Sequence, residues 1–150
     1  AVPAAEVVAR PMSDGGPGFL DAIAAATGAN PFLVSTNGPH GAAQQAPVLV
    51  VDGDVRSAYL EAASCCGLHL VAEPRRPLDA SCGGLAPLIE AAIAAGAERL
   101  VVGVGGTAST DGGRPVVEAL DGLLDVELSL VGDLLSPSRR AVLLQSLRDA

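Results

Sequence analysis

Lysine is absent from the 150 residues of this sequence, and its 9 basic residues are all arginine. No lysine is therefore present to form a Schiff base, and the P-loop is excluded because that phosphate-binding motif requires lysine. Acidic residues outnumber basic ones by 17 to 9, which gives a net charge of -8 at pH 7. Because the basic surface that binds nucleic acid or anionic membranes is missing, we expect neither partner.

Aromatic residues are also scarce, at 2%, and tryptophan is absent. Hydrophobic residues reach 49% and charged ones only 17%, which excludes disorder and predicts a core of Ala, Val, Leu and Ile. The 3 cysteines do not suggest a disulfide framework, since Cys65 and Cys66 are adjacent. No apolar run approaches the ~18 residues of a membrane span, and the first residues lack the features of a signal peptide. We therefore expect a cytoplasmic protein.

The hydrophobic pattern alternates between short strand-like runs and alanine-rich helical runs. This alternation predicts a layered α/β fold with a mostly parallel sheet and flanking helices. The Asp52-Gly53-Asp54 turn between apolar runs predicts a hairpin, and Gly28 and Gly96 are expected to end helices. We expect strands over residues 4–10, 32–35, 48–51, 56–60, 99–104 and 126–131, and helices over residues 19–27, 85–93, 116–120 and 137–148.

A loop of glycine and small polar residues follows the strand predicted over residues 99–104. Ligands of open α/β sheets bind at the carboxyl ends of strands, and free N–H groups at a helix start attract anions. Thr107, Ser109 and Thr110 add hydroxyl groups, and Asp111 adds a carboxylate that could hold Mg²⁺ or a substrate hydroxyl. The pattern fits a ligand-binding loop and a tight structural connection equally well.

An earlier loop, over residues 12–18, follows the same plan. Its Asp14-Gly15-Gly16 sequence recurs at residues 111–113, and each copy precedes a candidate helix. Two acidic glycine loops facing one cleft would suit a nucleotide with its magnesium and a small hydroxy acid. For one such loop alone, the better explanation is that Asp14 caps the helix or makes an Asx-turn.

Together with two further stretches, these loops resemble motifs of the bacterial glycerate kinase family. Residues 11–19 read P-M-S-D-G-G-P-G-F, similar to P-M-A-D-G-G-E-G-T in the family. Residues 105–113 read G-G-T-A-S-T-D-G-G, similar to G-G-S-A-T-N-D-G-G. Residues 59–68 resemble the I-E-M-A-x-A-S-G-L stretch, and residues 81–89 resemble the T-Y-G-T-G-x-L-I stretch. The four stretches occur in the family's order, which makes them far more specific together than singly.

The resemblance implies phosphorylation of glycerate or a related hydroxy acid, with ATP and Mg²⁺, by two α/β domains around a cleft. It implies that residues 1–150 contribute to two lobes with a boundary near residues 35–80. Asp14 and Asp111 are the expected catalytic acids, Asp111 is the expected metal ligand, and Glu61 is a third candidate acid. The expected substrate- and nucleotide-binding residues are Gly15, Gly16, Glu61, Gly105, Gly106, Thr107, Ser109, Gly112, Gly113 and Arg114.

The sequence also departs from the family pattern. The D-S-F-K-G motif does not occur, Pro17 stands where the family has Glu, and Thr110 stands where it has Asn. A non-catalytic homologue or fragment that binds a nucleotide or small hydroxy acid is therefore the alternative, with a purely structural fragment ranked third. Arg114 could bind phosphate bidentately, although a solvated helix start is its more usual role. The sequence leaves the oligomeric state open.

Overall fold

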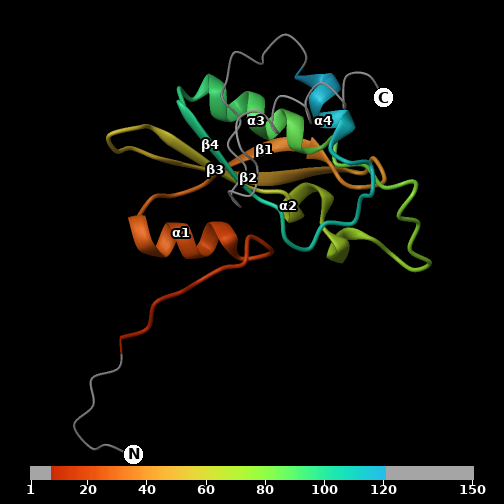
Figure 1. Cartoon of the computed structure of the whole chain (residues 1–150), viewed down its shortest axis with the longest axis horizontal. Helices are drawn as coiled ribbons and strands as arrows, with labels where there is room; N and C mark the ends of the chain where they lie inside the picture. The colour runs from red at the N-terminus through yellow and green to blue at the C-terminus, as the bar shows by residue number, and fades with distance from the viewer. Residues whose placement is uncertain (1–7, 121–150) are drawn as a thin grey trace, which may run out of the picture.

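The computed structural model describes residues 8–120. Figure 1 shows a sheet with helices on both faces and an extended segment of the described residues before the first helix. The elements are α1 (Phe19–Thr27), β1 (Phe32–Asn37), β2 (Ala43–Val51), β3 (Ser57–Glu61), α2 (Ala63–Cys66), the 3-10 helix η1 (Leu68–Leu70), α3 (Leu85–Ala94), β4 (Arg99–Gly103) and α4 (Arg114–Ala119). The layered α/β class is thus confirmed. Residues 8–10 form no strand, and the elements expected over residues 126–131 and 137–148 lie outside the described residues.

The sheet is mixed, so the expectation of a mostly parallel sheet is wrong. Its strand order is β1-β2-β3-β4, and the first two pairs are antiparallel while β3 and β4 are parallel. The physical reason is the length of the connections. Five residues separate β1 from β2 and five separate β2 from β3, which allows only hairpins, whereas α3 provides the crossover that a parallel pair needs. The division into two lobes near residues 35–80 stays a prediction.

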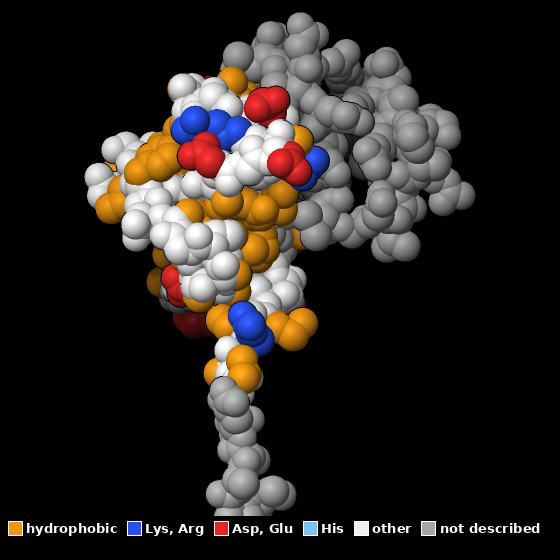
Figure 2. Space-filling model, turned by 90° about the vertical axis from the view of Figure 1, so that its left-hand side faces the viewer, with side chains coloured by type: hydrophobic (Ala, Val, Ile, Leu, Met, Phe, Trp, Pro, Cys, Tyr) orange, Lys and Arg blue, Asp and Glu red, His pale blue; other side chains and the backbone are white. Residues whose placement is uncertain are grey.

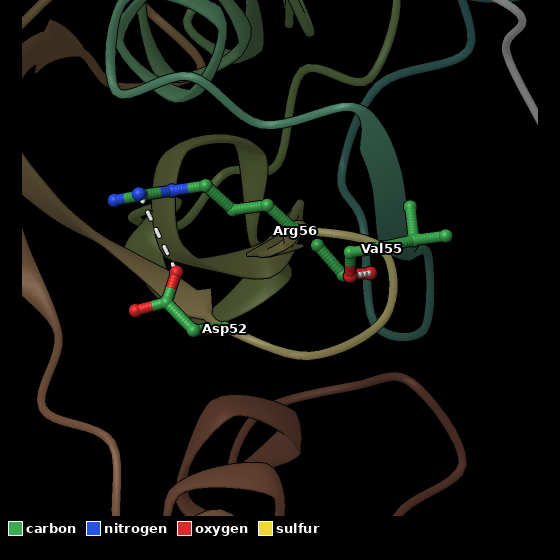
Figure 3. A network of polar contacts seen from close by, with 4 residues as sticks. Asp52, Val55 and Arg56 are labelled. Carbon is green, nitrogen blue, oxygen red and sulfur yellow. Dashed lines mark hydrogen bonds and ion pairs between the residues drawn. The ribbon is translucent and has the colours of Figure 1, made fainter.

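The predicted hairpin turn joins β2 to β3 and is confirmed. In Figure 3 the Arg56 side chain reaches back over the turn to Asp52, with 3.4 Å between the guanidinium nitrogen and the carboxylate oxygen. The Arg56 carbonyl accepts the N–H of Glu98, which ties the start of β4 to the hairpin at 2.8 Å. In a view facing this end of the molecule, acidic and basic side chains lie close together above a band of hydrophobic ones (Figure 2). Such exposed ion pairs add little stability.

Side chains of the strands alternate between two unequal layers. One face of the sheet packs against α3 through a cluster that includes Val48, Leu60, Leu88 and Leu100. The opposite face carries Tyr59, whose ring lies 6.3 Å from that of Phe19 on α1. Figure 1 accordingly shows α3 and α1 on opposite sides of the sheet. Alternate residues of each strand therefore point to opposite faces of the sheet. The face under α3 carries the large hydrophobic cluster, and the face under α1 carries a thinner layer.

Glycine ends α1 as expected. Gly28 has a φ of 74°, and its N–H bonds the carbonyl of Ala24 at 2.8 Å. This left-handed position favours glycine because a side chain there is strained. Within residues 8–120, none of the helices combines the length and the apolar character needed to cross a bilayer.

Candidate functional site

The parallel pair β3 and β4 brings two strand ends to one edge of the sheet. Glu61, the last residue of β3, lies in register with Gly103, the last residue of β4. The Ala62 N–H then donates to the Gly103 carbonyl at 2.9 Å, so the two chains stay together as they leave the sheet. Ligands of α/β proteins bind at such strand ends. The second glycine loop starts here, as the sequence predicts.

The first glycine loop packs directly on the start of the second. The Gly105 N–H donates to the Gly15 carbonyl at 3.0 Å, although 90 residues separate the two in sequence. A Cβ on Gly105 would lie 2.6 Å from the Gly16 nitrogen, and a Cβ on Gly103 would lie 2.6 Å from the Gly15 oxygen. Backbone thus meets backbone with no room for side chains. Gly103 and Gly105 are therefore needed for the contact between the loops, whereas a Cβ on Gly15 would lie 3.3 Å from the Gly103 Cα and one on Gly16 would lie 3.5 Å from the Gly105 carbonyl carbon.

Asp14 sits at the outer side of this contact and is exposed. Its Oδ1 accepts the Gly16 N–H at 2.9 Å, which is the Asx-turn weighed as an alternative from the sequence. The Gly15 N–H donates to the Ser13 hydroxyl at 3.1 Å. The first loop is therefore shaped by its own short polar side chains.

Glu61 lies beneath the first loop, with only 9% of its surface exposed. Its Oε2 accepts the N–H of Leu20, in the first turn of α1, at 3.4 Å. The structure thus brings together Gly15, Gly16, Glu61 and Gly105, which the sequence assigns to one site.

The far end of the second loop makes a different set of contacts. Oδ2 of Asp111 accepts the Cys82 N–H at 2.8 Å, and Oδ1 accepts the Gly113 N–H at 3.3 Å. Burial acts to raise the pKa of Asp111, but the hydrogen bonds from Cys82, Gly113 and Ser109 outweigh it and lower this pKa. Burial and the neighbouring Asp111 raise the pKa of the Cys82 thiol to about 12. This end of the loop is therefore held against the residues that precede α3.

The expected role of Asp111 as metal ligand stays a prediction. Each of its oxygens accepts one backbone N–H, that of Gly113 within the same loop and that of Cys82 before α3, which leaves a further lone pair on each oxygen. Over residues 8–120, no group of three or more His, Cys, Asp or Glu side chains could hold a metal ion. Among the described residues Asp111 and Asp14 share no hydrogen-bond partner, so a hollow shared by these two acids stays a prediction.

Two exposed backbone N–H groups lie on the second loop. The Gly106 carbonyl accepts the Leu68 N–H, and Ala108 donates to the Cys66 carbonyl, both at 2.8 Å. The N–H groups of Gly106 and Gly112 find no partner among the described residues, and both glycines are exposed. The second loop has four glycines among the expected binding residues. The N–H groups of Gly105 and Gly113 donate within the protein, so only those of Gly106 and Gly112 are open to a ligand among the described residues.

The remaining expected contacts lie at the surface. Thr107 is exposed and forms an isolated bridge with Gly67. The Arg114 Nε lies 2.6 Å from Oε1 of Glu118 on the same helix, and both side chains are more than half exposed. Arg114 therefore lies at an exposed helix start, and its contact with phosphate stays a prediction.

Two of the site's partners carried no sequence signal. The Leu20 N–H that meets Glu61 and the Cys82 N–H that meets Asp111 are backbone groups, 41 and 29 residues away from their acceptors. Any residue except proline supplies a backbone N–H, so residue type could not have revealed either contact.

Comparison with known proteins decides the family. The sequence profile of the glycerate kinase family matches residues 1–133. The chain belongs to the glycerate kinase family. It is 40% identical over 132 residues to the glycerate kinase of Bacillus subtilis strain 168, covering 87% of this chain and 34% of that protein. It is 39% identical to the glycerate 2-kinase of Escherichia coli K12, covering 79% of this chain and 31% of that protein.

A solved structure agrees with this assignment. The chain is similar to a crystal structure provisionally assigned as glycerate kinase 2 from Salmonella typhimurium LT2, with a TM-score of 0.67 and 38% identity. That match covers 79% of this chain and 32% of the Salmonella chain. The chain thus spans about a third of the length of the family members it matches, such as 34% of the Bacillus subtilis protein.

Proposed function

We propose that this chain is part of a kinase that transfers a phosphoryl group from ATP to glycerate. The observation that carries the proposal is the contact between the two glycine loops at the carboxyl ends of β3 and β4, where Gly105 bonds Gly15 at 3.0 Å. These loops hold the two acidic motifs that resemble the family's. The proposal also draws on the relatives that carry the names glycerate kinase and glycerate 2-kinase. A cytoplasmic location, where ATP is found, fits this activity.

Phosphoryl transfer requires positioned phosphates and an oriented hydroxyl rather than covalent chemistry by the protein. In our proposal the exposed N–H groups of Gly106 and Gly112 bind phosphate oxygens. Both glycines have a positive φ, 71° and 62°, which favours glycine at these positions. The exposed Asp14 of the first loop accepts the proton of the glycerate hydroxyl, and Thr107 contributes a hydroxyl from the second loop. Asp111 keeps its loop in shape.

Mg²⁺ is expected to accompany ATP, because kinases use it to neutralise charge on the phosphates. Within residues 8–120, no group of three or more His, Cys, Asp or Glu side chains forms a metal site built by the protein alone, and each oxygen of Asp111 accepts one backbone N–H. We therefore derive no step of the reaction through the metal and assign none of these residues to it.

A coupled assay of ADP release tests the proposal, with glycerate compared against other small hydroxy acids. Asp14→Asn is expected to lower kcat by about 100-fold or more, since general acid–base groups contribute that much. The matched control is Asp21→Asn, because Asp21 is also exposed and lies close by on α1. Absence of glycerate-dependent ADP release would contradict the proposal, as would equal activity of the two variants.

One observation favours the alternative of a family member that binds ligand without turnover. Four glycine N–H groups of the two loops, those of Gly15, Gly16, Gly105 and Gly113, already donate to acceptors within the protein. Binding without transfer would appear as a rise in melting temperature with ATP or glycerate and no release of ADP. A structural fragment would show neither effect.

A further inference from the structure

The acid at the end of β3 has a different environment from the other two candidate acids. Asp14 is exposed and Asp111 is held by its own loop, but Glu61 is 9% exposed and reaches across to another element. A buried carboxylate needs a partner, because leaving its charge without one costs several kcal/mol. The partner here is the start of α1.

The start of α1 lacks a cap of its own. Its N-cap residue is Gly18, which has a φ of 92° and no side chain that could accept a hydrogen bond. The first N–H groups of a helix have no acceptor within the helix. The Phe19 N–H is satisfied by the Gly16 carbonyl at 3.0 Å, and the Leu20 N–H is satisfied by Oε2 of Glu61 at 3.4 Å. Glu61 therefore does, from 41 residues away, what a capping Ser or Asp usually does locally.

Neighbouring contacts place Glu61 for this task. Tyr59 lies two residues before Glu61 on β3, so the two side chains share one face of the sheet. On that face the Tyr59 ring packs against Phe19, the residue before Leu20. Phe19 also covers Gly103, where a Cβ would lie 2.8 Å from the Phe19 ring. The helix start is thus fixed by an aromatic contact, a close glycine contact and a carboxylate.

The charge of Glu61 suits this position as well. The N-terminus of a helix carries a partial positive charge, which a carboxylate stabilises. No basic side chain forms an ion pair with Glu61 among the described residues. The helix start is therefore the positive group that the carboxylate meets.

We propose that Glu61 is a positioning residue of the kinase site, which holds the loop of residues 14–18 against Gly103 and Gly105 by accepting the Leu20 N–H. The proposal rests on the function proposed above, because the loop that it holds carries Asp14. It assigns Glu61 no contact with substrate and no proton transfer. In this proposal Asp14 is exposed to solvent, and Glu61 holds the loop that carries Asp14 through its hydrogen bond with Leu20.

Three substitutions separate positioning from proton transfer. Glu61→Gln keeps an oxygen that can accept the Leu20 N–H but cannot act as a base. Glu61→Asp keeps a base but withdraws it by one methylene from Leu20. Glu61→Ala removes both properties. A positioning role predicts that Gln retains more activity than Asp, whereas a proton-transfer role predicts the reverse order.

The first measurement is the rate of hydrogen exchange at the Leu20 amide, monitored by NMR. Glu61→Ala is expected to speed this exchange by about tenfold or more, as expected for loss of a hydrogen bond to a charged group. Glu61→Gln keeps the acceptor but not the charge, so it is expected to speed the exchange by less than Glu61→Ala does. The second is kcat/KM for glycerate and ATP, which is expected to follow the same order. Glu90→Ala is the control, since Glu90 is exposed on α3.

The two proposals fail in different ways. If the parent chain releases no ADP, the kinase function fails, while exchange at Leu20 still tests the contact. If Glu61→Ala leaves Leu20 exchange unchanged, the positioning role is wrong. It is also wrong if Glu61→Gln is less active than Glu61→Asp while Leu20 stays protected. Even where Glu61→Ala fails to fold, the relative activities of Glu61→Gln and Glu61→Asp distinguish a positioning role from proton transfer.

Discussion

Replacing Gly105 by alanine tests whether the two glycine loops depend on their backbone contact. The added methyl group would lie 2.6 Å from the Gly16 nitrogen, 2.8 Å from the Gly16 Cα and 3.1 Å from the Gly15 carbonyl carbon. All three atoms belong to the backbone, so no side chain can rotate away to make room. Gly105 has no positive φ, so alanine brings steric overlap without conformational strain. The loops must therefore separate.

The expected magnitude follows from three contributions. Overpacking of this kind costs about 1–3 kcal/mol. Loss of the hydrogen bond from Gly105 to Gly15 adds about 0.5–1.5 kcal/mol. Against these, alanine restricts the unfolded chain and offsets about 0.4–1 kcal/mol. We therefore expect Gly105→Ala to lower the free energy of unfolding by roughly 1–3 kcal/mol, since a detached first loop would relieve part of the overlap.

Urea unfolding followed by circular dichroism measures this change, with Gly53→Ala as the matched control. Gly53 lies in the hairpin turn without a positive φ, and a Cβ there would meet only the Val55 oxygen, at 3.9 Å. The control should stay within about 0.5 kcal/mol of the parent chain. If Gly105→Ala is as stable as Gly53→Ala, the contact between the loops does not exist in solution and the reasoning about the site is wrong.

Three further predictions concern the core and the second loop. Leu88→Ala should lower the free energy of unfolding by about 2–5 kcal/mol in urea, because Leu88 is fully buried against the sheet; a smaller loss would contradict the packing of α3. Cys65, Cys66 and Cys82 are buried, so a thiol-reactive dye at about pH 8 should label them only after denaturation, and rapid labelling of the native chain would contradict this. The lowered pKa of Asp111 means that the unfolded chain binds more protons, so its contribution to stability is present above about pH 4 and is lost as the pH falls through the lowered pKa. Asp111→Asn should remove that part of the acid sensitivity in denaturation measured at several pH values, and an unchanged pH dependence would refute it.

Local signals predicted the elements that local interactions determine. The helix over residues 19–27 is found with its bounds unchanged, and Gly28 ends it in the left-handed conformation. The Asp-Gly turn at residues 52–54 gives the hairpin, and the β-branched run after Arg99 gives the parallel strand β4. Each of these depends on the conformational preferences of a few adjacent residues, which the sequence displays directly.

The directions of the strands and the partners of the acids depend on distant parts of the chain. The sequence supplied the hairpin turn, yet alternation with helices favoured a mostly parallel sheet, and connection length decided otherwise for β1 and β2. The hydrogen bonds of Glu61 and Asp111 end on backbone N–H groups of Leu20 and Cys82, which no residue type marks. The sequence therefore predicted Glu61 and Asp111 as candidate acids but could not predict which backbone groups they bind.

The glycines of the two motifs have two distinct physical tasks. From the sequence, all of them could serve close approach to a ligand. In the structure, Gly103 and Gly105 approach Gly15 and Gly16 instead, so their missing side chains allow one loop to rest on the other. A substitution at Gly103 or Gly105 should then disturb Asp14 through the first loop, whereas one at Gly112, where a Cβ meets nothing within 4 Å, acts through its own φ of 62° and its own N–H. The second motif thus separates into Gly105, which contacts the first loop that carries Asp14, and Gly106 and Gly112, whose N–H groups we propose as donors to phosphate.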